Sequence, residues 1–107
     1  MKTILATLAL VFAFVWNASA NDPAYESAMK KQIQAMKTIQ SPEESQAVAN
    51  GFLRIAEVKN TEWLPLYYAA YLQTIAAFRF EVNKDQYFDQ AMELVNKADK
   101  IAQRLSN

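Results

Sequence analysis

The sequence contains no cysteine and no histidine among its 107 residues. The absence of cysteine excludes disulfides, thiol catalysis and cysteine metal sites. The absence of histidine removes the commonest general base near neutral pH and the commonest metal ligand. The chain also has no glycine-rich phosphate loop, no HExxH motif and no EF-hand spacing. These absences predict a protein that is not an enzyme and that uses neither a cofactor nor a metal.

Glycine and proline are scarce as well, with one and three residues respectively. An all-β protein uses more of both in its turns, whereas the abundant Ala, Gln, Lys, Glu, Leu and Met are helix formers. Hydrophobic residues make up 52% of the chain and charged residues 21%, which is ordinary for a globular domain. The formal net charge is zero, so the chain carries no overall electrostatic signal for nucleic acid. The composition predicts one all-α domain that does not bind nucleic acid.

Residues 1–20 have the pattern of a secretory signal peptide. Lys2 supplies the positive start, an apolar run covers residues 4–16, and Ala-Ser-Ala at residues 18–20 fits the small-x-small cleavage rule. The alternative is a membrane anchor, but this run of 13 residues is shorter than the roughly 20 that a spanning helix needs. We therefore expect an exported protein, periplasmic or secreted. Its mature domain covers residues 21–107, with no membrane span after cleavage.

The first predicted helix of the mature chain has a clear start. Asp22 can act as its N-cap, and Pro23 suits the first helical position, where no backbone N–H is needed. Apolar residues recur at steps of three and four along it, which indicates one buried face. These residues are Tyr25, Met29, Ile33 and Met36. The helix is expected to fade near Ile39.

The second predicted helix begins with the cleanest local signal in the chain. Ser41 is an N-cap, Pro42 takes the first position, and Glu44 stands where a capping box needs a carboxylate. The helix should end near Val58. Gly51 lies inside it at a cost of about 1 kcal/mol relative to Ala. Either a neighbouring helix approaches closely at Gly51, or the cost is simply tolerated.

The third predicted helix contains the densest apolar segment, residues 61–72, with three of the five tyrosines. Thr61 can cap it, and it should run to about Phe80. Its apolar residues surround it almost completely, which is typical of a central helix. A fourth helix, capped by Asn83 or Asp85, should follow a loop and end near residue 105.

Small residues at matching positions indicate a repeat. Ala49-x-x-x-Leu53-x-x-Ala56 in the second helix recurs as Ala91-x-x-x-Val95-x-x-Ala98 in the fourth, 42 residues later. This spacing resembles the second helix of a tetratricopeptide repeat (TPR), and Ala69 gives the third helix a resemblance to the first helix of such a repeat. Residues 62–71 also resemble small exported TPR-like proteins of Bacteroidota-type bacteria. The resemblance implies four antiparallel helices that form two hairpins, residues 22–58 and 61–105. The repeat length differs from the usual 34 residues, and an ordinary four-helix bundle is the alternative.

Aromatic residues of the third helix are the candidate binding residues. Trp63, Tyr67 and Tyr71 share one face by spacing, and Tyr68 lies on another face with Leu64, Leu72 and Ile75. Tyr and Trp are effective anchors at protein interfaces, although the alternative for each of these side chains is a place in the core. We therefore assign partner binding to Trp63, Tyr67 and Tyr71.

Three functions fit these observations. The first is a non-catalytic protein-interaction module that binds a peptide or a partner protein. The second is a self-associating structural protein, because two hairpins are fewer than the three repeats that such stacks usually need, so that a homodimer would complete the core. The third is a carrier that holds a small ligand between its helices.

Overall fold

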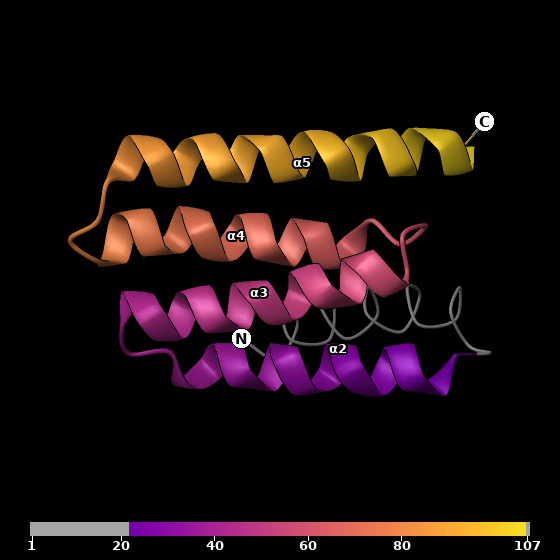
Figure 1. Ribbon diagram of the computed structural model, residues 1–107, viewed down its shortest axis with the longest axis horizontal. Coiled ribbons are helices and arrows are strands. Elements are labelled where there is room, and N and C mark those ends of the chain that lie inside the picture. Colours follow the sequence, from indigo (N-terminus) through magenta and orange to yellow (C-terminus); the bar gives the residue numbers. More distant parts are fainter. Residues whose placement is uncertain (1–21, 107) are drawn as a thin grey trace, which may run out of the picture.

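The computed structural model describes residues 22–106, so the predicted signal peptide lies outside the described residues. Within this range the chain forms helices and no strand, which confirms the all-α prediction. The elements are α2 (Pro23–Ala35), the short 3₁₀ helix η1 (Met36–Thr38), α3 (Pro42–Val58), α4 (Leu64–Arg79) and α5 (Lys84–Ser106). The four α-helices lie side by side in chain order (Figure 1). None of these helices is long and apolar enough to cross a membrane.

The starts of α2 and α3 are those that the sequence predicts. Asp22 Oδ1 accepts a hydrogen bond of 3.0 Å from the backbone N–H of Tyr25. Ser41 Oγ accepts one of 3.1 Å from the N–H of Glu44, whose carboxylate accepts one of 2.8 Å from the N–H of Gln40. Both caps satisfy backbone N–H groups that have no partner inside the helix.

One prediction about a helix start needs correction. Thr61 does not cap α4, which begins at Leu64 with Trp63 as its N-cap and no capping side chain. The N–H of Glu62 donates to the carbonyl oxygen of Lys59 at 3.0 Å, so the chain is still in a turn at the expected start. The expected loop before the fourth helix ends at Asn83, the first of its two candidate caps, because α5 begins at Lys84.

Asn83 is the residue that caps α5. Its Oδ1 accepts a hydrogen bond of 3.1 Å from the N–H of Gln86. Asp85 then falls in the first turn of α5, where its charge favours the positive end of the helix dipole. The connection between α4 and α5 is therefore only residues 80–83.

Helix α4 occupies the centre of the fold, as its apolar sequence predicts. It packs against α3 on one side and α5 on the other, as Figure 1 shows. The larger core cluster joins α2, α3 and α4 through Tyr25, Met29, Ile39, Ala49, Phe52, Ala69 and Leu72. A smaller cluster joins α4 and α5 through Leu66, Ala98 and Ile101, with Leu53 of α3 packed against it.

Gly51 lies where a side chain of α2 packs on α3. The side-chain amide of Gln32, from α2, occupies the space that a Cβ atom at Gly51 would need. The neighbour at Gly51 is thus the flexible end of a side chain from α2.

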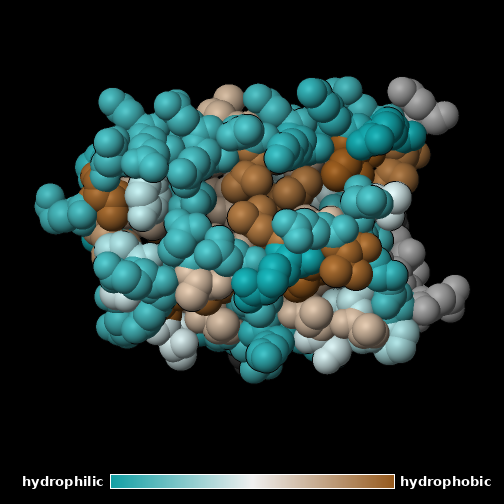
Figure 2. All heavy atoms as spheres, in the orientation of Figure 1, coloured by the Kyte–Doolittle hydropathy of each residue, from teal (hydrophilic) through white to brown (hydrophobic). Residues whose placement is uncertain are grey.

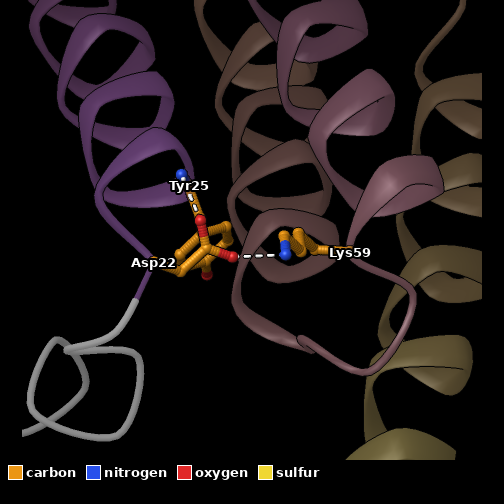
Figure 3. Close-up of polar contacts among 3 residues, drawn as sticks. All are labelled: Asp22, Tyr25 and Lys59. Carbon is orange, nitrogen blue, oxygen red and sulfur yellow. Dashed lines mark hydrogen bonds and ion pairs between the residues drawn. The ribbon is translucent and has the colours of Figure 1, made fainter.

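An ion pair also joins α2 to α3. The carboxylate of Asp22 contacts the Nζ atom of Lys59, the residue that follows α3 (Figure 3). The Lys59 side chain, together with the N–H of Tyr25, holds the pKa of Asp22 below its ordinary value of 3.8. The start of the first described helix is thus fixed to the end of the second.

A polar contact lies inside the packing of α3, α4 and α5. The side chain of Gln73 is only 4% exposed. Its Nε2 donates to Gln90 Oε1 of α5 at 2.9 Å and to Gln46 Oε1 of α3 at 3.4 Å. A buried amide needs such partners, because an unpaired one costs free energy.

Candidate partner-binding surfaces

The side of α4 that neither neighbouring helix covers carries two exposed tyrosines. Tyr67 is 47% exposed and Tyr71 is 53% exposed. They are four residues apart, so they lie on the same face of the helix. A concavity of about 380 Å³ runs beside them, and we call it the aromatic groove. Its lining residues are Leu64, Tyr67, Tyr68, Ala70, Tyr71, Thr74 and Val95. The lining is apolar except for the tyrosine hydroxyls and Thr74.

Trp63 stands apart from the other two predicted binding residues. Its ring meets the Tyr67 ring edge to face, with centroids 5.8 Å apart and an angle of 79° between the planes. It is half-buried and packs against the core cluster that contains Leu66 and Ile101. The structure therefore brings Tyr67 and Tyr71 together along the groove, whereas Trp63 supports Tyr67 and does not line the groove.

Tyr68 has a different position from its neighbour Tyr67. Its ring is stacked on Phe52 of α3, with centroids 4.9 Å apart and an angle of 8° between the planes. Burial raises the pKa of Tyr68 to about 12. Tyr68 also lines the aromatic groove, so the two faces that the sequence separates meet at this groove. The side chain forms a wall of the groove and a part of the core at once.

Further apolar side chains are exposed near the aromatic groove. Ile75 is 38% exposed and Phe78 is 75% exposed, and both follow Tyr71 on α4. Phe78 contacts Phe88 of α5 edge to face at 5.6 Å. Spacing alone assigned Ile75 to the face of Tyr68 and gave Phe78 no role in binding, although steps of four and seven from Tyr71 also place both residues on the face of Tyr71. They extend the apolar surface along α4 beyond the groove.

A second concavity, of about 480 Å³, lies between α3 and α5, and we call it the basic groove. Its apolar lining comes from Leu53, Ala56, Leu66, Leu94 and Ile101. Its polar lining comes from Lys97, Lys100 and Arg104 of α5 and from Glu57 and Asn60 on the α3 side. Sequence reasoning missed this groove because its walls are far apart in the chain. Figure 2 shows one face of the molecule, where apolar atoms gather beside α5 and hydrophilic atoms surround them.

The two grooves differ in the groups that line them. Across residues 22–106, no group of three or more Asp and Glu side chains is placed to hold a metal ion. Among residues 22–106, the pKa is shifted at Asp22, which caps α2, at Tyr25 in the core, and at Tyr68, which lies between the core and the aromatic groove. The aromatic groove offers apolar contact together with tyrosine hydroxyls. The basic groove offers apolar contact together with cations.

Comparison with protein-family models, with curated proteins and with solved structures gives no match to this chain.

Proposed function

We propose that the protein is an exported, non-catalytic interaction module that binds a peptide or a segment of a partner protein in the aromatic groove. The observation that carries this proposal is the pair Tyr67 and Tyr71, each about half exposed beside a concavity. Monomeric proteins rarely leave contiguous large apolar side chains in water without a use for them. With Ile75 and Phe78, these tyrosines form such a surface along α4.

The groove suits a peptide because of its size and lining. Its volume of about 380 Å³ lies within the range of pockets that hold small ligands or single side chains. Tyrosines contribute a large contact area and lose little conformational entropy, and for this reason they are common anchors at interfaces. A partner would place an apolar side chain against Tyr67 and Tyr71 and would hydrogen-bond their hydroxyls. Trp63 would hold Tyr67 in position from behind.

We further propose that the four helices are two antiparallel TPR-like hairpins. The order of the helices in space follows the chain, and the connections between them are short, which supports this arrangement. Ala49, Ala69, Ala91 and Ala98 are all buried, in agreement with close helix packing at the small positions of the pattern. In TPR-like proteins the first helices of the hairpins line the binding surface, and α4 would be such a helix.

The test of the binding site begins with selection of peptides from a displayed random library on the immobilised protein. The affinity of each selected peptide is then measured for the unchanged protein, for the variant Tyr67→Ala with Tyr71→Ala, and for a control. The control, Val58→Ala, removes another exposed apolar side chain, which lines neither groove. We expect loss of about tenfold or more in affinity for the tyrosine variant, because two anchors are removed. The control should bind as the unchanged protein does.

Equal binding by the tyrosine variant and the unchanged protein would place the site elsewhere. Sedimentation of the same variants separates peptide binding from self-association. If the unchanged protein is a dimer and the tyrosine variant is a monomer, the face of α4 serves a second copy, and the self-associating alternative replaces this proposal.

Export rests on the sequence of residues 1–20 alone. It is tested by expressing the full-length chain in bacteria, separating the compartments and determining the N-terminal residue of the recovered protein. We expect Asn21 at the N-terminus of protein outside the cytoplasm. Protein that keeps Met1 and stays in the cytoplasm would contradict export.

A further inference from the structure

We propose a second binding site: the basic groove holds an acidic amphipathic helix of a partner protein. Three features of the groove specify this partner. They are a row of cations, an apolar lining and an opposite wall of different charge.

The row of cations runs along α5. Lys97, Lys100 and Arg104 are exposed, and they succeed one another at steps of three and four. No ion pair among residues 22–106 involves any of these three cations, although Arg104 Nε donates a hydrogen bond of 3.5 Å to the carbonyl oxygen of Lys100. The pair Glu93 with Lys97, favourable by its spacing, is not formed either. The positive charge of this wall is therefore available to a ligand.

The dipole of α5 explains only part of this row. Cations near the C-terminus of a helix are favourable, but the effect falls off within the last turn. Arg104 lies in the last turn of α5, which ends at Ser106, whereas Lys97 lies more than two turns before that end. The two lysines are thus not accounted for by the helix end.

The apolar lining lies directly beside the cations. Leu66 and Ile101 are each 9% exposed and belong to one core cluster, with Leu53 and Leu94 packed against it. The concavity continues past Ile101 and Arg104 into a neighbouring one that Leu105 lines, and Leu105 is 64% exposed. A partner could therefore insert apolar side chains over several turns of α5.

The spacing of the cations favours a helix as the ligand over a molecule with a single anionic head group. From Lys97 to Arg104 the rise along α5 is about 10 Å. One carboxylate or phosphate group can meet only one part of such a row. Acidic side chains at steps of three and four on a partner helix can meet all of it, because the two helices then present charges at the same intervals.

The opposite wall sets the orientation of the partner. Glu57 and Asn60 line the groove on the α3 side, so a carboxylate placed there would meet a like charge at Glu57. The acidic edge of the partner helix should face α5, and its neutral or basic edge should face α3. The groove therefore requires an apolar stripe with acids on one edge only.

The experiment uses two synthetic amphipathic peptides that have the same apolar stripe. One carries glutamates along one edge, and the other carries glutamines at the same positions. Their affinities are measured by fluorescence anisotropy, and the contact residues are located by amide chemical shifts of the labelled protein. We expect the glutamate peptide to bind about tenfold more tightly, because three charge pairs form at the rim. The shifted amides should lie in α3 and α5 around residues 53–60 and 94–104.

Matched variants test the role of the cations. In the first variant, Lys97, Lys100 and Arg104 are replaced by Gln. In the control variant, Lys31, Lys37 and Arg54, which are also exposed, are replaced by Gln, so that the net charge changes equally. Only the first should reduce the affinity for the glutamate peptide to that for the glutamine peptide, and added salt should have the same effect. Urea unfolding of each variant shows that it is folded.

Several results would overturn the proposal. They are equal affinity for both peptides, equal loss in both variants, and amide shifts centred on Tyr67 and Tyr71. Binding of phosphatidylglycerol vesicles that displaces the peptide would show that an anionic lipid occupies the groove instead. A dimer that dissociates only in the first variant would show a second copy there. The variant Tyr67→Ala with Tyr71→Ala should keep the affinity for the glutamate peptide, which separates this site from the aromatic groove.

Discussion

The ring of Tyr68 in α4 lies flat on the ring of Phe52 in α3, with centroids 4.9 Å apart. Phe52 is fully buried, and Tyr68 is half-buried. This contact separates two adjacent tyrosines by role, because Tyr67, one residue earlier, points to the exposed side of α4. The stack therefore decides which aromatic residues support the fold and which remain available to a partner.

This division of roles predicts different effects on stability. Phe52→Ala should lower the free energy of unfolding by about 3 kcal/mol or more, because a large core side chain is lost, and Tyr68→Ala by about 2 kcal/mol. Tyr67→Ala and Tyr71→Ala should each change it by less than about 1 kcal/mol. Urea unfolding followed by circular dichroism measures all four. Comparable losses for Tyr68→Ala and Tyr71→Ala would contradict the assignment of Tyr71 to a binding surface.

Gly51 offers a test of the contact between α2 and α3. An alanine at this position should improve helix propensity by about 1 kcal/mol. Its Cβ, however, would meet the flexible end of the Gln32 side chain. We expect Gly51→Ala alone to be nearly neutral and Gly51→Ala with Gln32→Ala to be more stable than Gln32→Ala by about 1 kcal/mol. Gly51→Leu should destabilise the protein, because a large side chain would separate the helices. Thermal unfolding of the series distinguishes these cases.

Gln73 links three helices through its buried amide, and its replacement should be costly. Gln73→Leu leaves Gln90 without its donor and should lower the free energy of unfolding by about 1–2 kcal/mol. Gln73→Leu with Gln90→Leu should recover part of this loss, because both polar partners are then removed. Gln46→Ala, which removes the contact of 3.4 Å with Gln73 and an exposed hydrogen bond of 3.1 Å to Asn50, serves as the control. A double-mutant cycle with no coupling between positions 73 and 90 would rule out the contact.

The ion pair between Asp22 and Lys59 should make the free energy of unfolding decrease at acidic pH. The pKa of Asp22 is lower in the folded protein than its ordinary value of 3.8. Its contribution is therefore fully present well above pH 3.8 and is lost as the pH falls through the lowered pKa. Asp22→Asn keeps a good N-cap residue and removes the charge. Urea unfolding at pH 7 and at pH 2 should show a difference between the two proteins that shrinks at the lower pH. A difference that is the same at both values would contradict the ion pair.

The buried hydroxyl of Tyr25 should make the stability of the fold depend on pH in the alkaline range. Its side chain is 3% exposed, and its hydroxyl has no hydrogen-bond partner among the described residues. Burial, and then the charge of Glu62, raises the pKa of Tyr25 above its ordinary value of 10.0. Stability is therefore fully present below pH 10 and falls as the pH rises further, because the unfolded chain releases the proton first.

The variant Tyr25→Phe tests this dependence. At pH 7 it should be as stable as the unchanged protein or more stable by up to about 1 kcal/mol, because an unpaired buried hydroxyl is removed. Between pH 9 and about pH 11 it should lose less stability than the unchanged protein. Urea unfolding over this range gives the measurement, and Tyr71→Phe is the control. A loss of stability at pH 7 would mean that the hydroxyl has a stabilising partner.

Local signals in the sequence determined much of the fold. The caps at Asp22 and Ser41 and the end of α3 at Val58 follow from residues within one helical turn, and the structure has them as predicted. The central position of α4 follows from its apolar residues. The predicted start of α4 at Thr61 was wrong, because the turn between Lys59 and Glu62 depends on backbone geometry that no single residue type signals.

The tertiary structure alone decided which side chains are exposed and which surfaces are hollow. Helical spacing placed Trp63, Tyr67 and Tyr71 on one face, but the positions of α3 and α5 around α4 determine that Trp63 packs on the core and that the two tyrosines border a groove. The basic groove needs Leu53 and Ile101 side by side, and residues so distant in sequence meet only when three helices pack. Spacing specifies the direction of a side chain from its own helix, whereas burial depends on what the other helices place in front of it.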